Sequence, residues 1–258
     1  MNKPFSKNYE VHYYEINKHL EAAPLSLVNF LEDAAIWHSQ SVGLGLDRLK
    51  EDGLGWILNG WFLEFQRPAH LFENLIVETW PSSFERFYAT REFLVKNTAG
   101  ELLVRASSLW ILVNIEKGRP VRIPERFGEA YGLNSARAVD HSFDKMDIHT
   151  DFEIEKQFYI RKSDIDTNEH VNNKKYLDWM LEAIPEAVYD NFSLSSLEIS
   201  YIKGAYYGST ILSRCKTLEE ELSLHKYLHT IQNNASDLIH ATGRTEWISR
   251  AQAAGGLQ

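Results

Sequence analysis

Cysteine is nearly absent from this sequence, since Cys215 is the only one in 258 residues. A single cysteine excludes an intrachain disulfide and a CxxC-type metal site. No neighbour of Cys215 is suited to activating its thiol, so the sequence predicts a small strand residue rather than a nucleophile. Long apolar runs are also absent: none approaches a membrane span, and residues 1–6 contain no apolar signal core. A cytoplasmic protein without a membrane span is expected.

Basic residues are fewer than acidic ones, which gives a formal net charge of −9. This balance argues against a nucleic-acid partner and against adsorption to an anionic membrane. The ten histidines are scattered without a His/Asp/Glu set at ligand spacing, so we expect no metal and no cofactor. Five cations nevertheless gather along one stretch: Arg161, Lys162, Lys174, Lys175 and Lys203. They form either a rim for phosphates or an acidic partner, or a solvated helix face.

A polar motif precedes a predicted helix in the second half of the chain. Asp166, Asn168 and His170 stand at alternate positions, and alternate side chains of an extended or turning segment point the same way. Asn172 or Asn173 can cap the helix that follows, which Pro185 ends. The sequence therefore predicts a polar cluster at a helix N-terminus, where free N–H groups suit a developing oxyanion.

These residue types can support hydrolysis. His170 beside a helix N-terminus should favour its neutral form and exchange a proton near pH 7, and Asn168 can orient a water molecule or a carbonyl group. Asp166 can polarise the water, orient its neighbours or attack directly. A capped polar loop with a structural role is the alternative interpretation of the same residues.

The remaining pattern predicts an α+β protein. The first half reads as a strand over 5–17 and a helix from Pro24 to Gly43, whose apolar stripe includes His38. Strands are then expected at 54–66, 73–80, 86–97 and 101–115, with turns at Pro68, at Pro81-Ser-Ser and at Asn97-Thr-Ala-Gly100. The second half repeats this order, with strands at 152–163, 196–203, 207–217, 222–234 and 237–249 around the motif helix. Residues 63–77 also align without gaps with residues 197–211, which suggests an internal duplication.

Asp164-Ile-Asp-x-Asn-x-His-Val-Asn-Asn-x-x-Tyr176 closely resembles the motif of the acyl-acyl-carrier-protein (acyl-ACP) thioesterases, the chain-terminating hydrolases of fatty-acid synthesis in plants and bacteria. Three stretches of the first half are similar to that family too: Trp56-Ile-Leu through Phe65, Phe87-Tyr-Ala-Thr-Arg91-Glu-Phe, and Trp110-Ile-Leu-Val-Asn114 through Arg122-Ile-Pro124. The resemblance spans nearly the whole chain.

The resemblance implies a tandem double hotdog, each half a long central helix wrapped by an antiparallel β-sheet. It implies an N-terminal domain over 1–127 that shapes the acyl pocket, a linker over 128–150, and a catalytic domain over 151–258. Acyl carrier protein is the expected partner, and the sequence leaves open whether the chain forms a homodimer. The catalytic residues implied are Asp166, Asn168 and His170. Candidate substrate-binding residues are Asn172, Asn173, Tyr176, Trp37 and Trp56, with core packing as the favoured alternative role of Trp37 and Trp56.

One position departs from the family. A further carboxylate commonly follows the motif helix, on the next strand, yet Gly204 or Ile202 stands there in this sequence. Either the three motif residues suffice, or Glu198 substitutes, or activity is weak; we favour the first. Two other functions stay open, namely an acyl-coenzyme A thioesterase, which shares the phosphopantetheine arm, and a non-catalytic acyl-binding hotdog protein. A hotdog dehydratase fits the motif order less well.

Overall fold

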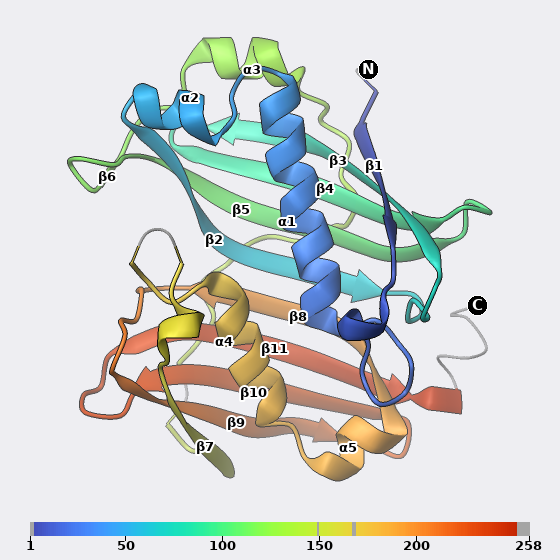
Figure 1. The fold of residues 1–258 in the computed structure, drawn as a ribbon. Coiled ribbons are helices and arrows are strands. Elements are labelled where there is room, and N and C mark those ends of the chain that lie inside the picture. The colour runs from blue at the N-terminus through green and yellow to red at the C-terminus, as the bar shows by residue number, and fades with distance from the viewer. Residues whose placement is uncertain (1–2, 149, 167–168, 252–258) are drawn as a thin grey trace. The chain divides into compact units, whose positions relative to one another are not determined.

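The computed structural model describes residues 3–148, 150–166 and 169–251. The chain divides into two compact units, one formed by residues 1–64 and 68–142 and the other by residues 65–67 and 143–258. In each unit a helix lies across one face of an antiparallel sheet (Figure 1). The predicted α+β class and the duplicated order of elements are confirmed.

The sheet of the first unit has the strand order β1-β3-β4-β5-β2, and the short β6 pairs with β5. Its strands are β1 (Phe5–Glu10), β2 (Leu54–Phe65), β3 (Asn74–Glu85), β4 (Tyr88–Asn97), β5 (Leu102–Asn114) and β6 (Arg119–Pro120). Side chains along these strands alternate between the core and the other face, as the period of two requires. Trp61 and Phe93, both fully buried, meet in this core with ring centroids 5.1 Å apart.

The central helix of the first unit is α1 (Pro24–Ser41), as the sequence predicts. Pro24 occupies the first turn, where its missing N–H is not needed, and Gly43 follows the end of the helix with φ +75°. Leu27 and Leu31 are buried at helical spacing, and each contributes roughly 1.5–3 kcal/mol by leaving water. This apolar stripe fixes which face of α1 meets the sheet.

The second unit repeats the arrangement with the strand order β8-β11-β10-β9-β7. Its strands are β7 (Ile154–Tyr159), β8 (Phe192–Tyr201), β9 (Thr210–Glu220), β10 (Leu224–Asn233) and β11 (Ile239–Ser249). The helix on this sheet is α4 (Asn173–Glu182), which packs on β9 and β10 and buries Tyr176, Leu177, Trp179 and Met180. The motif therefore precedes the central helix of the second unit.

Several predicted boundaries are wrong, among them that of the strand expected over 152–163, which ends at Tyr159 before a 3-10 helix over Lys162–Asp164. The turn expected at Pro81-Ser-Ser lies inside β3, where the pairing register with β4 shifts between Pro81 and Ser83. The residue left unpaired by this bulge is Ser82, next to Pro81, and prolines inside sheets are found at such bulges. The chain turns instead at Arg86, which has φ +56°. The strand expected over 5–17 ends at Glu10, and residues Tyr13–Glu15 form a 3-10 helix.

Three short helices were not predicted: α2 (Leu46–Glu51), α3 (Glu125–Tyr131) and α5 (Glu186–Asn191). Residues 134–142 then run along the first unit, held by the ion pair of Arg137 with the fully buried Glu92, at 2.7 Å, and by the hydrogen bond from the Trp80 indole to the Ala136 carbonyl, at 2.9 Å. Among the described residues, no helix has the length and apolar character to span a membrane.

Candidate active site

The motif forms a closed loop in front of α4. Ile165 and Val171 make an antiparallel bridge, and between them the N–H of Asp166 donates to the carbonyl of His170 at 2.8 Å. Glu169 turns the chain with φ +62° and donates its N–H to the carbonyl of Asp166 at 3.2 Å. The backbones of two predicted catalytic residues, Asp166 and His170, are thus adjacent. Asn168, the third, lies outside the described residues.

Asn172 is the N-cap of α4. Its side-chain oxygen accepts the N–H of Lys174 at 3.1 Å, and its own N–H donates to the carbonyl of Asp164 at 2.8 Å. The sequence left Asn172 and Asn173 as alternative caps, and the geometry selects Asn172, with Asn173 as the first helical residue. The loop and the helix therefore share one network of hydrogen bonds.

Asp164 holds the motif loop in place through its carboxylate. Its side chain is buried, and its carboxylate accepts the N–H of Arg161 at 2.8 Å and lies 3.3 Å from the Arg161 guanidinium and 3.8 Å from the ammonium of Lys175. Burial opposes ionisation, but the Arg161 hydrogen bonds and the two cations outweigh it and lower the pKa of Asp164. The hydrogen bonds and ion pairs that hold this loop thus involve Asp164 and Asn172, which lie on either side of the predicted catalytic residues in the chain.

A second loop, residues 202–209 between β8 and β9, packs against the motif. The carbonyl of Ala205 accepts the N–H of Val171 at 3.0 Å, and the N–H of Ala205 donates to the Tyr176 hydroxyl at 2.9 Å. Tyr176 is 2% exposed, and its burial and the charge of Asp166 raise its pKa to about 12, against the lowering effect of the Ala205 hydrogen bond. The Tyr176 hydroxyl, neutral at pH 7, therefore ties α4 to the β8–β9 loop.

The β8–β9 loop brings two residues to the imidazole of His170. The hydroxyl of Tyr206 lies 3.1 Å from Nε2 of His170, with ring centroids 4.8 Å apart. Gly204 lies against the same ring, because a Cβ added to it would stand 2.4 Å from Cδ2 of His170. Gly204, which with Ile202 is one of the two positions where the family resemblance leads us to expect a carboxylate, thus lies against His170 and has no side chain.

Two other candidate groups from the sequence, Cys215 and Glu198, lie on strands of the second unit. Cys215 lies in β9 and is fully buried, and burial raises the pKa of its thiol to about 12, so its thiolate is not accessible at pH 7. Glu198 is buried on β8, opposite Arg244 of β11. Among the residues that the structure describes, no three His, Cys, Asp or Glu side chains are placed to hold a metal ion.

The two predicted tryptophans belong to the first unit. Trp37 on α1 is 51% exposed and lies under the ammonium of Lys7, which is 4.8 Å from the ring. Trp56 on β2 is partly buried, with its ring centroid 6.3 Å from that of Phe84 and 6.2 Å from that of Phe127. His38 beside Trp37 is buried and shares a hydrogen bond with the buried Arg91 at 3.0 Å.

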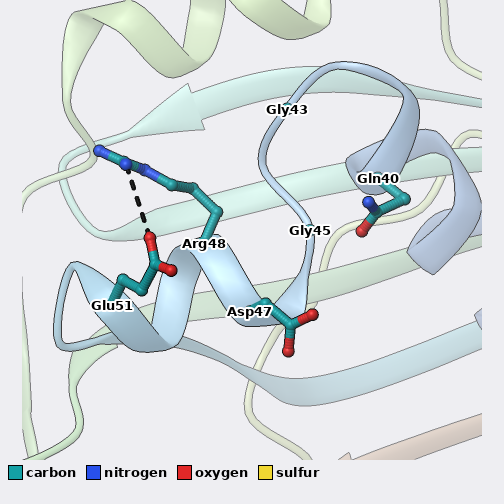
Figure 2. A pocket seen from close by; sticks show the side chains of 6 residues that line it. All are labelled: Gln40, Gly43, Gly45, Asp47, Arg48 and Glu51. Atoms are coloured by element: carbon teal, nitrogen blue, oxygen red, sulfur yellow. Dashed lines mark ion pairs between the residues drawn. The ribbon is translucent and has the colours of Figure 1, made fainter.

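A surface pocket of the first unit lies between the end of α1 and α2 (Figure 2). Its lining residues are polar or glycine, and two of them, Arg48 and Glu51, form an ion pair at 3.6 Å. The Gln40 amide already fills the space beside Gly45. An opening of this kind does not suit an acyl chain, because no aliphatic or aromatic side chain is among its lining residues.

Two tandem units, each with a helix on an antiparallel sheet, define a double hotdog fold. The motif lies at the N-terminus of α4, the central helix of the second unit. The family model of the acyl-ACP thioesterase N-terminal domain matches residues 2–131, and that of the C-terminal domain matches residues 148–249. The chain therefore belongs to the acyl-ACP thioesterase family.

Solved structures share this fold. A 12:0-ACP thioesterase from Umbellularia californica superposes with a TM-score of 0.85 at 24% identity, over 95% of this chain and 94% of that chain. An acyl-ACP thioesterase from Bacteroides thetaiotaomicron gives a TM-score of 0.83 at 19% identity, over 94% and 96% of the two chains. These likenesses show the fold.

Among curated proteins, a chloroplastic acyl-[acyl-carrier-protein] hydrolase of Cuphea viscosissima is 28% identical over 98% of this chain and 64% of its own length. A palmitoyl-acyl carrier protein thioesterase of Gossypium hirsutum is 30% identical over 94% of this chain and 63% of its own. The chain thus spans less than two thirds of the length of these relatives.

Two contributors to the site were not predicted. Asp164 belongs to the recognised motif, and its position two residues before Asp166 gave no sign that it would be the buried anchor. Tyr206 is 36 residues from His170 in the chain, and an exposed Tyr-Tyr pair after a glycine carries no recognisable signal. Only the return of the β8–β9 loop brings Tyr206 to the imidazole.

Proposed function

We propose that this chain hydrolyses the thioester of fatty acyl-acyl-carrier-protein and releases the free fatty acid, which ends chain elongation. The observation that carries the proposal is the match of both family domain models, together covering residues 2–131 and 148–249. The names of the Cuphea and Gossypium relatives describe hydrolysis of acyl-carrier-protein thioesters, and the proposal extends that activity to this chain.

The motif loop supplies the chemistry in this proposal. Asp166, Asn168 and His170 act as the catalytic residues, with a carboxylate to polarise or replace the attacking water and an imidazole to transfer protons. The closed loop supports these roles, because the hydrogen bond from Asp166 to the His170 carbonyl keeps the two residues adjacent. The N–H groups of Asn172, Lys174 and Lys175 are already bound within the loop and the cap, so the proposal assigns the oxyanion donor at the start of α4 to the N–H of Asn173.

Acyl carrier protein, which is acidic and carries the phosphopantetheine arm, is the proposed partner. Lys162 and Lys203 are exposed on the two loops that meet at the site, and the Lys162 ammonium lies 5.9 Å from the Tyr207 ring of the β8–β9 loop. We call these two lysines the cationic rim. Arg161 and Lys175, which the sequence grouped with them, are bound to Asp164 instead. The cationic rim supports a phosphate-bearing or acidic substrate in either thioester series.

The remaining site assignments belong to the same proposal. Asn172, Asn173 and Tyr176 are the proposed substrate-binding residues beside the motif, and the cap and the Ala205–Tyr176 hydrogen bond that fix the start of α4 support this assignment. Trp37 and Trp56 are the proposed acyl-chain contacts of the first unit, and the partial exposure of both rings leaves surface for such a contact. Acyl-coenzyme A hydrolysis remains the alternative function, because coenzyme A carries the same arm.

The test is release of free thiol from acyl-carrier-protein substrates of increasing acyl length, with the matching acyl-coenzyme A series measured in parallel. We expect turnover of the carrier-protein series with a preference for one chain length. His170→Ala and Asp166→Ala should each lower kcat by about 10²-fold or more, because each removes a group that transfers or polarises a proton. Circular dichroism of the variants controls for folding.

Each outcome separates the candidate functions. Faster hydrolysis of acyl-coenzyme A than of the carrier-protein series would favour the alternative thioesterase. Wild-type turnover of both series no higher than that of His170→Ala would contradict an enzyme, and binding of acyl chains without hydrolysis would then be the function that the fold serves.

A further inference from the structure

The β8–β9 loop is held in a fixed position beside the motif by backbone hydrogen bonds at both ends. Near its start, both polar backbone groups of Ala205 are bound, one by Val171 and the other by the Tyr176 hydroxyl. Near its end, Gly208 donates to the carbonyl of Ile160 at 3.2 Å, and Ile160 donates to the carbonyl of Ser209 at 3.0 Å. Residues between these ends, including Tyr206, therefore meet the motif in a defined place.

A glycine is needed at position 204 because there is no room for a side chain there, not because of its backbone conformation. Its φ is not among the positive values, so any residue could adopt its backbone angles. A Cβ at this position would nevertheless stand 2.4 Å from Cδ2, 3.2 Å from Cγ and 3.3 Å from Nε2 of His170. The missing side chain thus lets the imidazole lie directly on the backbone of the loop, where it reaches the hydroxyl of Tyr206.

We propose that Tyr206 is a positioning residue of the hydrolytic site: its hydroxyl holds Nε2 of His170 and keeps the imidazole oriented while the ring gains and loses a proton. This inference rests on the proposed function of the same motif. It is carried by the distance of 3.1 Å between the two atoms, by the ring contact at 4.8 Å, and by the space that Gly204 leaves.

A phenol suits this task because it both donates and accepts a hydrogen bond. When Nε2 is unprotonated, the Tyr206 O–H donates to it, and when Nε2 carries a proton, its N–H donates to the phenol oxygen. The contact therefore survives a proton transfer in either direction. A carboxylate only accepts, so it would hold the protonated ring and stabilise its charge.

The experiment compares Tyr206→Phe with the wild type and with Tyr207→Phe. Tyr207 is the neighbouring exposed tyrosine, so its variant is a matched control. Loss of the Tyr206 hydroxyl should lower kcat by roughly three- to tenfold, the range of one hydrogen bond, with KM unchanged. Tyr207→Phe should leave kcat within about twofold. A kcat for Tyr206→Phe equal to that of Tyr207→Phe would overturn the proposal.

A double-mutant cycle tests whether Tyr206 acts through His170. In a His170→Ala background, Tyr206→Phe should cause no further loss of kcat, since the group it positions is gone. An equal loss in both backgrounds would show that Tyr206 acts on something else and would reject the inference.

A readout without activity separates this proposal from the proposed function. The ¹⁵N chemical shifts of the His170 ring report which nitrogen carries the proton, and they can be measured in an inactive chain. We expect Tyr206→Phe to change the two ring shifts, and Tyr207→Phe to leave them as in the wild type. Unchanged shifts in Tyr206→Phe would refute the positioning role even if the chain hydrolyses thioesters, whereas changed shifts in a chain without turnover would leave it standing and reject only the hydrolase.

Discussion

At Gly204, one methyl group would compete with the His170 ring for the same space. The Gly204→Ala variant places a Cβ 2.4 Å from Cδ2, so the imidazole must move, because Ala205 is bound through both its N–H and its carbonyl. A displacement on the order of 1 Å in a reacting group can cost about 10²-fold in rate. We expect kcat of Gly204→Ala to fall by about 10- to 100-fold with little change in melting temperature.

Gly128→Ala is the matched control for that substitution. Gly128 lies in α3, and a Cβ there would make ordinary contacts, the nearest at 3.6 Å from Leu133. Its kcat should equal that of the wild type. Undiminished turnover in Gly204→Ala would mean that the His170 position seen here is not the one used in the reaction.

The sequence predicted the motif itself but not the residues that pack around it. The Asp-x-Asn-x-His spacing and the capping asparagine are local signals, and the structure places Asp166, His170 and Asn172 in one loop before α4. The contact with Tyr206 depends on the path of a distant loop, which no local pattern encodes. The resemblance singled out Gly204 or Ile202 as a departure from the family, but the contact of Gly204 with the imidazole appears only in the structure.

At the scale of elements, the start of α4 connects the loop to the helix through Asn172. Its side-chain oxygen accepts the N–H of Lys174, and its own backbone N–H donates to the carbonyl of Asp164. Asn172→Ala should therefore lower the free energy of unfolding by about 1 kcal/mol and should also reduce kcat, because the loop loses its fixed attachment. Denaturant titration and steady-state kinetics on the same samples measure both effects.

Asn172→Asp distinguishes capping from substrate binding. An aspartate caps as well as asparagine does, so stability should return to within a few tenths of a kcal/mol of the wild type. Recovery of kcat together with stability would assign Asn172 to the cap. If stability recovers while KM stays raised, Asn172 also contacts substrate.

Long elements were predictable and short ones were not. Helix α1 has several buried residues at helical spacing, with a proline at its start and a glycine beyond its end. Helices α2 and α5 span six residues each, too few for a periodic stripe to stand out. Pro81 led to a wrong prediction because prolines usually mark turns, whereas here a bulge accommodates it within β3.

Across the whole molecule, both units bury polar side chains within their cores. In the first unit, Arg91 is 7% exposed and lies between His38, the Thr79 hydroxyl and the face of the Tyr131 ring. In the second unit, His229 is 2% exposed and shares a hydrogen bond with Thr245 at 2.9 Å. Such groups are tolerated because they are neutral or partnered, which makes the stability of the fold depend on pH.

Burial lowers the pKa of both His229 and His38 from 6.5 to about 3, and the charge of Arg91 adds to the effect at His38. Below pH 6.5 the unfolded chain therefore binds protons that the folded chain does not. The free energy of unfolding should fall as the pH falls from 6.5 towards 3, by about 1.4 kcal/mol per pH unit for each histidine once the pH is well below 6.5. Urea titrations at several pH values measure this slope.

The variant His229→Gln isolates one histidine, because its amide can still bond to Thr245 but does not titrate. Between about pH 4.5 and 6 its stability should depend less steeply on pH than that of the wild type, by up to about 1.4 kcal/mol per unit. Asp164 does not obscure this range, because its pKa is lowered from the ordinary aspartate value of 3.8 and its own contribution fades only at more acidic pH. Parallel slopes for the variant and the wild type would show that His229 is protonated within the folded chain, contrary to its burial among β10 and β11.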